Sequence, residues 1–164
     1  MSKALADGMN NIIANLTVLY MKMHHFHWYV KGTNFYVLHE KFEQFYNDLA
    51  GYIDEIAERL LTLNEAPVST LEECLRRATV EEAKGDLSEQ QMVEETISDF
   101  AKVIQQLKEC LKAAEQEGDD ITNDLLLSIA AQMDKNIWML RAFSGKNAVP
   151  PQKAEPVEWL KKRG

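Results

Sequence analysis

The stretch that decides the fold is residues 35–64, FYVLHEKFEQFYNDLAGYIDEIAERLLTLN. Apolar residues recur in it at intervals of three and four, it contains no proline, and its β-branched residues are isolated. This spacing predicts a single long amphipathic helix. The helix is expected to end before Ala66-Pro67, because a residue that precedes proline is disfavoured in the helical conformation.

The same periodicity continues on both sides of this stretch. Lys31-Gly32-Thr33 interrupts it, with Gly32 suited to a left-handed helix cap and Thr33 or Asn34 suited to a new N-cap. Ser69-Thr70-Leu71-Glu72 and Ser88-Glu89-Gln90-Gln91 are typical of capping boxes that open further helices. Gly118-Asp119-Asp120 indicates a tight turn. The predicted helices therefore cover about residues 3–29, 35–64, 69–77, 88–116 and 121–143.

Four long helices and one short helix are typical of a four-helix bundle, so the fold is expected to be all-α. The short helix falls between the second and third long helices, which a long connection must therefore join. Such a connection favours an up-up-down-down or crossover arrangement over simple hairpins. We expect residues 1–145 to form the bundle and residues 146–164, which contain three prolines, to form an extended C-terminal tail.

Composition narrows the class of protein. The chain has 164 residues, enough for one domain, and no segment approaches the roughly 20 apolar residues that cross a bilayer. Its N-terminus lacks the basic-then-apolar build of a secretion signal. Cys74 and Cys110 stand alone rather than in a C-x-x-C pair. We therefore expect a cytoplasmic protein without membrane contact, whose cysteines are small core or interface residues.

Helical bundles that bind iron usually do so through carboxylates and histidines, most often with a Glu-x-x-His pair on each of two helices. That pair is absent here, because the last histidine is residue 39 and the first glutamate is residue 40. The helix over 35–64 offers another arrangement. At about 100° per residue, one arc of this helix carries four potential ligands, His39, Glu43, Asp54 and Glu58. They flank an apolar stripe made of Tyr46, Ala50, Ala57 and Leu61.

The four potential ligands form two couples, His39/Glu43 and Asp54/Glu58. His39 and Asp54 are separated by roughly 22 Å along a straight helix. Two bridged metal ions lie only about 4 Å apart. One chain therefore cannot bring both couples to the same metal site.

Two chains can bring the couples together. Positions 39 and 58 share a midpoint with positions 43 and 54, and this midpoint falls between Asp48 and Leu49. A twofold axis there would place each histidine-bearing couple beside the acidic couple of a second subunit, which gives two identical sites in an isologous dimer. His27, late in the preceding helix, is positioned to add a further nitrogen. Two histidines and three carboxylates suit iron.

A purely structural interpretation competes with the metal site. Acidic side chains on a helix flank are usually solvated or paired, for instance with Arg59, and lone histidines usually satisfy local hydrogen bonds. The Asp54/Glu58 couple is mildly destabilising by itself at a spacing of four residues. A positive group is therefore expected to face it, and the shared midpoint favours a metal ion in that role.

The segment HWYVKGTNFYVLHEKFE at residues 27–43, followed by DEIAERLL at 54–61, resembles the Dps family, the mini-ferritins named as DNA-binding proteins from starved cells. The similarity continues through STLEE at 69–73, GDDITND at 118–124 and IWMLRA at 137–142. It covers nearly the whole helical region. The resemblance implies a ferritin-like bundle that assembles from twofold dimers into a hollow dodecameric shell, with di-iron ferroxidase centres at the twofold interfaces.

By position, the resemblance assigns His27, His39 and Glu43 to one subunit and Asp54 and Glu58 to its neighbour. Close relatives commonly have aspartate where this chain has Glu43, so the extra methylene is expected to shift a metal ion or alter its occupancy. The implied reaction is oxidation of two Fe(II) ions by hydrogen peroxide, or more slowly by O2. The ferric product is stored as mineral inside the shell, which protects the cell and its DNA from oxidative damage.

The resemblance also implies roles for Trp28 and for acids at the start of the helix over 121–143. Trp28 is expected to lie near the centre as an electron donor, although an aromatic residue at helical spacing more often belongs to a packed core. Asp120 and Asp124, with Asp119 nearby, are expected to surround threefold pores in which a negative funnel concentrates Fe(II). Helix capping and the helix dipole give these acids a simpler role as well.

DNA is a further partner to consider. Family members that bind DNA commonly use lysine-rich tails, and this tail contains Lys153 and Lys161-Lys162-Arg163. The formal net charge of −8 and the companion acids Glu155 and Glu158 oppose binding, so DNA binding is not expected. The leading interpretation is an iron-oxidising storage shell. The alternatives are a DNA-compacting protein with secondary iron chemistry, and an assembly module whose site is empty or holds zinc.

Overall fold

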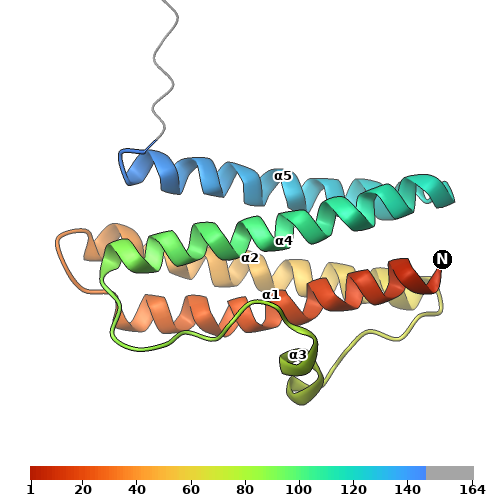
Figure 1. The fold of residues 1–164 in the computed structure, drawn as a ribbon, viewed down its shortest axis with the longest axis horizontal. Helices are drawn as coiled ribbons and strands as arrows, with labels where there is room; N and C mark the ends of the chain where they lie inside the picture. The colour runs from red at the N-terminus through yellow and green to blue at the C-terminus, as the bar shows by residue number, and fades with distance from the viewer. Residues whose placement is uncertain (147–164) are drawn as a thin grey trace, which may run out of the picture.

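The computed structural model describes residues 1–146 as five α-helices (Figure 1). Their bounds are Lys3–Tyr29 (α1), Phe35–Thr62 (α2), Leu71–Arg77 (α3), Glu89–Glu117 (α4) and Asp120–Phe143 (α5). No strand occurs within these residues. The predicted all-α fold and its helices are therefore confirmed. The predicted tail, apart from Lys146, lies outside the described residues.

One long crossover connects two helical hairpins. α1 and α2 run antiparallel through the short turn at residues 30–34, and α4 and α5 run antiparallel through Gly118 and Asp119 (Figure 1). The connection over residues 63–88 returns along the bundle and carries α3, so α2 and α4 run parallel. The predicted crossover is confirmed. The up-up-down-down alternative is wrong, because it needs a second long connection that residues 1–146 do not contain.

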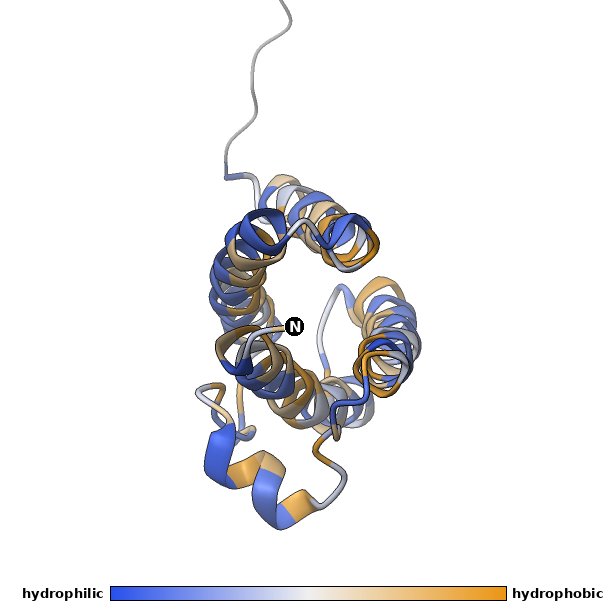
Figure 2. Ribbon diagram, turned by 90° about the vertical axis from the view of Figure 1, so that its right-hand side faces the viewer, coloured by the Kyte–Doolittle hydropathy of each residue, from blue (hydrophilic) through white to orange (hydrophobic). Residues whose placement is uncertain are grey.

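The apolar faces of the four long helices meet in one core. In an end view these helices surround a common interior, and α3 lies outside it (Figure 2). α2 contributes six buried residues, Leu38, Phe42, Phe45, Leu49, Ile56 and Leu60. Because this face of α2 points inward, the arc that carries the predicted ligands points away from the core. The apolar stripe beside that arc is only partly covered, since Ala50 and Leu61 are exposed.

Side-chain caps define where α3 and α4 begin. Ser88 and Gln91 form the predicted capping box of α4, with Ser88 Oγ accepting from Gln91 N at 3.2 Å and Gln91 Oε1 accepting from Ser88 N at 2.9 Å. The cap of α3 is Thr70 rather than Ser69, because Thr70 Oγ1 accepts from Glu73 N at 3.3 Å. Both hydroxyl residues have an acid three positions later, so the sequence pattern fits either one.

Gly32 and Glu89 shape the turn between α1 and α2. Gly32 has a φ of 127°, and a Cβ atom there would lie 2.6 Å from Glu89 Oε2. Glu89 uses this close approach to accept hydrogen bonds from Asn34 N at 3.1 Å and Asn34 Nδ2 at 2.8 Å. Asn34 is the N-cap of α2, but its own side chain makes no capping hydrogen bond. A carboxylate from the first turn of α4 therefore stabilises the start of α2.

Buried polar side chains of α1 hold the crossover against the bundle. Asn10 Oδ1 accepts from Val68 N at 2.7 Å, and Lys22 Nζ donates to the backbone oxygen of Glu81 at 3.1 Å. Lys22 also forms an ion pair of 2.7 Å with Asp99 of α4. Burial by itself would lower the pKa of Lys22, but hydrogen bonds and attraction from its carboxylate partners outweigh burial and raise that pKa. One ammonium therefore joins α1, the crossover and α4.

The cysteines agree with their predicted structural role. Cys74 and Cys110 are both buried free thiols. Burial raises the pKa of the Cys110 thiol to about 11, so this group stays protonated at neutral pH. Among residues 1–146, no helix has the length and apolar character to cross a membrane.

Candidate metal centre

His27 and His39 form a reciprocal pair where the end of α1 faces the start of α2. His27 Nδ1 lies 2.7 Å from the backbone oxygen of His39, and His39 Nδ1 lies 2.8 Å from the backbone oxygen of His27. The two rings stack with their centroids 3.7 Å apart and their planes 19° from parallel. His27 is buried and His39 is half-buried.

These two hydrogen bonds select the tautomer of each ring. A backbone oxygen can only accept, so each Nδ1 carries the proton and donates it. Each neutral ring therefore keeps its lone pair on Nε2, the nitrogen that can bind a metal ion. Metal-binding histidines usually have a carbonyl or carboxylate on their second nitrogen in this way. The structure thus brings two oriented nitrogen donors together within one chain.

Glu43 lies one turn beyond His39 on α2, with an exposed side chain. Tyr46 follows three residues later, and its ring centroid is 5.5 Å from that of His27. Burial, and after it the charge of Glu43, raises the pKa of Tyr46. Glu43 therefore lies close to Tyr46, whose ring also contacts His27.

Asp54 and Glu58 are exposed on the outward arc of the same helix. α2 is continuous from Phe35 to Thr62, so His39 and Asp54 remain roughly 22 Å apart in the structure. In the described part of the chain, no group of three or more His, Cys, Asp or Glu side chains is arranged to hold a metal ion. A single chain brings His27 and His39 together near Glu43 and leaves Asp54 and Glu58 apart from them.

Arg59 follows Glu58 in the sequence but is directed toward α5. Its Nη2 lies 2.7 Å from Asp119 Oδ1, and its Nε donates to Thr122 Oγ1 at 2.9 Å. Within residues 1–146, the ion pairs include none to Asp54 or Glu58. Arg59, the expected structural partner of this acidic couple, therefore pairs with Asp119 instead.

Comparison with known proteins identifies the family. The ferritin-like domain family matches residues 6–147. The chain is 46% identical to general stress protein 20U of Bacillus subtilis (strain 168), over 88% of this chain and 100% of that protein. It matches the crystal structure of Dps from Staphylococcus aureus with a TM-score of 0.85 and 42% identity, over 87% of this chain and 95% of that one. The chain belongs to the Dps family of ferritin-like proteins.

A more distant member of the Dps family adds a chemical description. The Dps protein from Vibrio cholerae O1 is described as a member of a broad superfamily of ferritin-like diiron-carboxylate proteins. Its crystal structure matches this chain with a TM-score of 0.83 and 33% identity, over 86% of this chain and 89% of that one. The similarity confirms the predicted ferritin-like fold of the present Dps-family chain.

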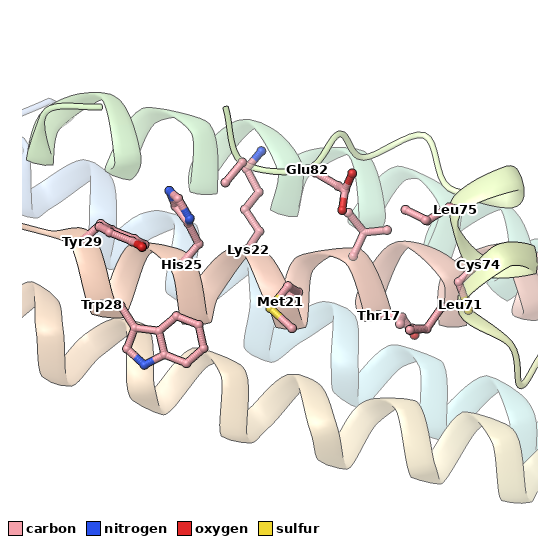
Figure 3. A pocket seen from close by; sticks show the side chains of 12 residues that line it. Thr17, Met21, Lys22, His25, Trp28, Tyr29, Leu71, Cys74, Leu75 and Glu82 are labelled. Carbon is pink, nitrogen blue, oxygen red and sulfur yellow. The ribbon is translucent and has the colours of Figure 1, made fainter. Parts of the chain in front are cut away.

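Trp28 of this Dps-family chain lies outside the packed core. Its side chain is 61% exposed. It lines an apolar groove of about 480 Å³ between α1 and α3, with Trp28 and Tyr29 at one end and Leu71 and Leu75 at the other (Figure 3). The groove contains none of the five predicted ligands. Core packing within one chain is therefore excluded as the role of Trp28.

The acids at the start of α5 divide into two groups. Asp119 is the N-cap of α5, where it accepts from Thr122 N at 3.0 Å and pairs with Arg59. Burial by itself would raise the pKa of Asp119, but the hydrogen bonds from Thr122 and the Arg59 guanidinium outweigh burial and lower that pKa. Asp120 and Asp124 are exposed. These two acids therefore remain the predicted pore residues, whereas Asp119 caps α5 and links it to α2 through Arg59.

Proposed function

We propose that this Dps-family chain is the subunit of a ferroxidase and iron-storage shell, and that it oxidises Fe(II) at centres shared by twofold-related subunits. The observation that carries the proposal is the reciprocal His27–His39 pair, in which both Nε2 atoms keep their lone pairs. A single histidine that donates Nδ1 to a backbone oxygen is not distinctive, because His24 does the same. Two such rings stacked on each other place two nitrogen donors side by side, and this arrangement supports a metal centre. Histidine nitrogens and carboxylates are also the donors expected from the description of the Vibrio cholerae relative as a ferritin-like diiron-carboxylate protein.

The partner subunit supplies the rest of the centre in this proposal. His27, His39 and Glu43 come from one subunit, and Asp54 and Glu58 come from the other. The exposed position of the acidic couple supports this arrangement, and so does the exposed Ala50 close to the midpoint of the two couples. A small side chain there lets two helices approach closely at their crossing. Each dimer then holds two equivalent centres.

Iron is the substrate and the stored cargo in this reaction. Two Fe(II) ions each give one electron to one hydrogen peroxide molecule, which takes up two protons and leaves as two water molecules. Because both electrons arrive together, no hydroxyl radical is released. Carboxylates are hard ligands that favour Fe(III) over Fe(II), so the three acids assist oxidation. Asp120 and Asp124 attract Fe(II) to the threefold pores of the dodecameric shell.

Subunit complementation tests this proposal directly. His39→Ala and Asp54→Ala variants are purified separately, dissociated, mixed in equal amounts and reassembled. Each variant alone should oxidise Fe(II) with peroxide at only the uncatalysed rate, because each loses one ligand from every centre. The mixture should recover roughly one quarter of the wild-type rate, because half of the dimers are mixed and each mixed dimer has one intact centre out of two.

The controls distinguish a centre shared by two subunits from a centre built within one subunit. A mixture of His39→Ala with Glu43→Ala should recover nothing, because both changes fall on the same half of the centre. Equal recovery in both mixtures, or none in either, would contradict the shared arrangement. Full activity in both single variants would reject these residues as iron ligands.

A further inference from the structure

A continuous path of rings leads away from the candidate iron ligands. The ring of Tyr46 meets His27 edge to face, with centroids 5.5 Å apart and planes at 88°. Tyr46 also stacks on His24, with centroids 3.7 Å apart and planes only 16° from parallel. His24 in turn lies 5.3 Å from the indole of Trp28. The path therefore runs from His27 through Tyr46 and His24 to Trp28.

The path gives each ring a defined position. Trp28 follows His27 in the sequence, yet its ring contact within residues 1–146 is with His24. Tyr46 is the ring next to the ligand, and it is half-buried, whereas Trp28 is mostly exposed. His24 is held in place because its Nδ1 donates to the backbone oxygen of Tyr20 at 2.8 Å. An oxidisable phenol thus lies inside, an oxidisable indole lies outside, and a fixed ring lies between them.

We propose that Tyr46 is an electron donor to oxidants formed at the iron site, and that it exchanges the oxidising equivalent with Trp28 through the stacked His24 ring. The source of the oxidant rests on the proposed ferroxidase function. The ring contacts along the path from His27 to Trp28 are observed independently of that function. Packing alone does not explain the phenol, because phenylalanine would stack on His24 equally well and a half-buried hydroxyl adds little to packing.

The chemistry begins when a centre holds a single iron ion. One Fe(II) then gives one electron to peroxide, which yields Fe(III), hydroxide and a hydroxyl radical. The radical takes a hydrogen atom from the Tyr46 phenol, which yields water and the Tyr46 phenoxyl radical. When the oxidant takes the hydrogen atom from Trp28 instead, Tyr46 restores the indole, since an electron of the phenol passes through His24 while the phenol proton goes to solvent and another proton returns to Trp28. The net exchange is one hydrogen atom between the two side chains.

Exchange is first tested on the iron-free assembly. The probe is the azidyl radical, made by pulse radiolysis, which removes one electron from tryptophan. Trp138 and Trp159 are changed to Phe, so Trp28 is the remaining tryptophan of the three. We expect the tryptophan radical to decay while a tyrosyl radical grows. Tyr46→Phe should abolish this growth, and so should His24→Leu, which breaks the stack.

Tyr52→Phe is the matched control, because Tyr52 is also a half-buried tyrosine of α2 but has no ring contact along this path. It should leave the growth of the tyrosyl radical unchanged. If Tyr46→Phe behaves like this control, the exchange between Trp28 and Tyr46 is overturned. Circular dichroism on each variant confirms that the helices are intact.

The iron-loaded experiment then tests the donor role. Trp28→Phe protein receives less Fe(II) than its centres can hold, followed by peroxide, and is freeze-quenched for electron paramagnetic resonance. A tyrosyl signal should appear, and Tyr46→Phe should remove it while Tyr52→Phe keeps it. Fe(II) consumption is followed in the same samples. Iron oxidation without a Tyr46 signal overturns the donor role but leaves the proposed function intact, whereas an absence of iron oxidation in the wild type rejects that function.

Discussion

Asn15 Oδ1 accepts a hydrogen bond from Val80 N at 2.9 Å, across 65 residues of sequence. The same oxygen accepts from Thr79 N at 2.8 Å, and the Asn15 side-chain nitrogen donates to Gln106 Oε1 at 2.7 Å. Asn15 is fully buried in the middle of α1. One amide therefore fixes the crossover to α1 and α1 to α4, which sets the position of the whole connection between the two hairpins.

Asn15→Ala should lower the free energy of unfolding by about 1–3 kcal/mol, because it leaves the buried Val80 N–H without an acceptor. The measurement is the midpoint and slope of urea denaturation followed by circular dichroism. Gln116→Ala, at an exposed position of α4, is the control and should change stability by no more than about 0.5 kcal/mol. Equal effects of the two substitutions would show that the hydrogen bonds of Asn15 do not contribute to the free energy of unfolding.

The helices could be predicted from the sequence, but the hydrogen bonds that hold the crossover against α1 could not. Helix periodicity and capping residues are local signals, so α1 to α5 were located within about two residues of their ends. Asn10, Asn15 and Lys22 interrupt the apolar face of α1, and the sequence does not show which distant backbone groups satisfy them. Their partners lie on the crossover, whose path depends on tertiary contacts.

The candidate site shows the same division between local and tertiary information. Helix geometry alone predicted that His39 and Asp54 cannot meet within one chain, and the unbroken α2 agrees. The carbonyl bonds that fix the tautomers of His27 and His39 could not be predicted, because they depend on how α1 and α2 pack. Tyr46 was interpreted only as part of an apolar stripe, since its contact with His24 joins two helices.

Asp119→Ala should destabilise the fold in a pH-dependent way. Asp119 caps α5 and pairs with Arg59, and its pKa is lowered below the ordinary value of 3.8. A carboxyl with a lowered folded-state pKa contributes stability above its unfolded pKa and loses that contribution as pH falls through the folded value. The variant should therefore lose about 1–3 kcal/mol at neutral pH, and the difference from wild type should shrink below about pH 4.

Urea midpoints at several pH values check this expectation. Asp124→Ala is the matched control, because Asp124 is an exposed acid of the same helix. Its effect on stability should be small at every pH. A loss for Asp119→Ala that stays constant down to strongly acidic pH would show that the carboxylate charge does not contribute.

Ala50→Trp should prevent the twofold contact without unfolding the subunit. Ala50 is exposed, so the single chain has room for the indole, whereas two helices that cross near residues 48 and 49 do not. We expect sedimentation velocity to show smaller species and peroxide-dependent Fe(II) oxidation to fall to the uncatalysed rate. Ala101→Trp, at an exposed position of α4, carries the same helix-propensity cost and is the control. Intact assembly of Ala50→Trp would place the twofold axis elsewhere.

DNA retention by this chain should be absent at physiological salt. The tail after Lys146 carries four bases, but it also carries two acids, and the formal net charge of the whole chain is −8. A negative body repels phosphates, and weak tail contacts are lost as salt rises because the release of counterions then gains less. Many tails on one shell act together at low salt through multivalency, so weak binding is expected there.

Gel shifts of double-stranded DNA over a range of salt concentrations separate weak multivalent binding at low salt from retention at physiological salt. A variant that ends at Lys146 is the control for the tail, and it should bind at no salt concentration. If the full chain retains DNA at about 0.15 M salt while the shortened chain does not, the DNA-compacting interpretation replaces the one in which the shell serves iron alone.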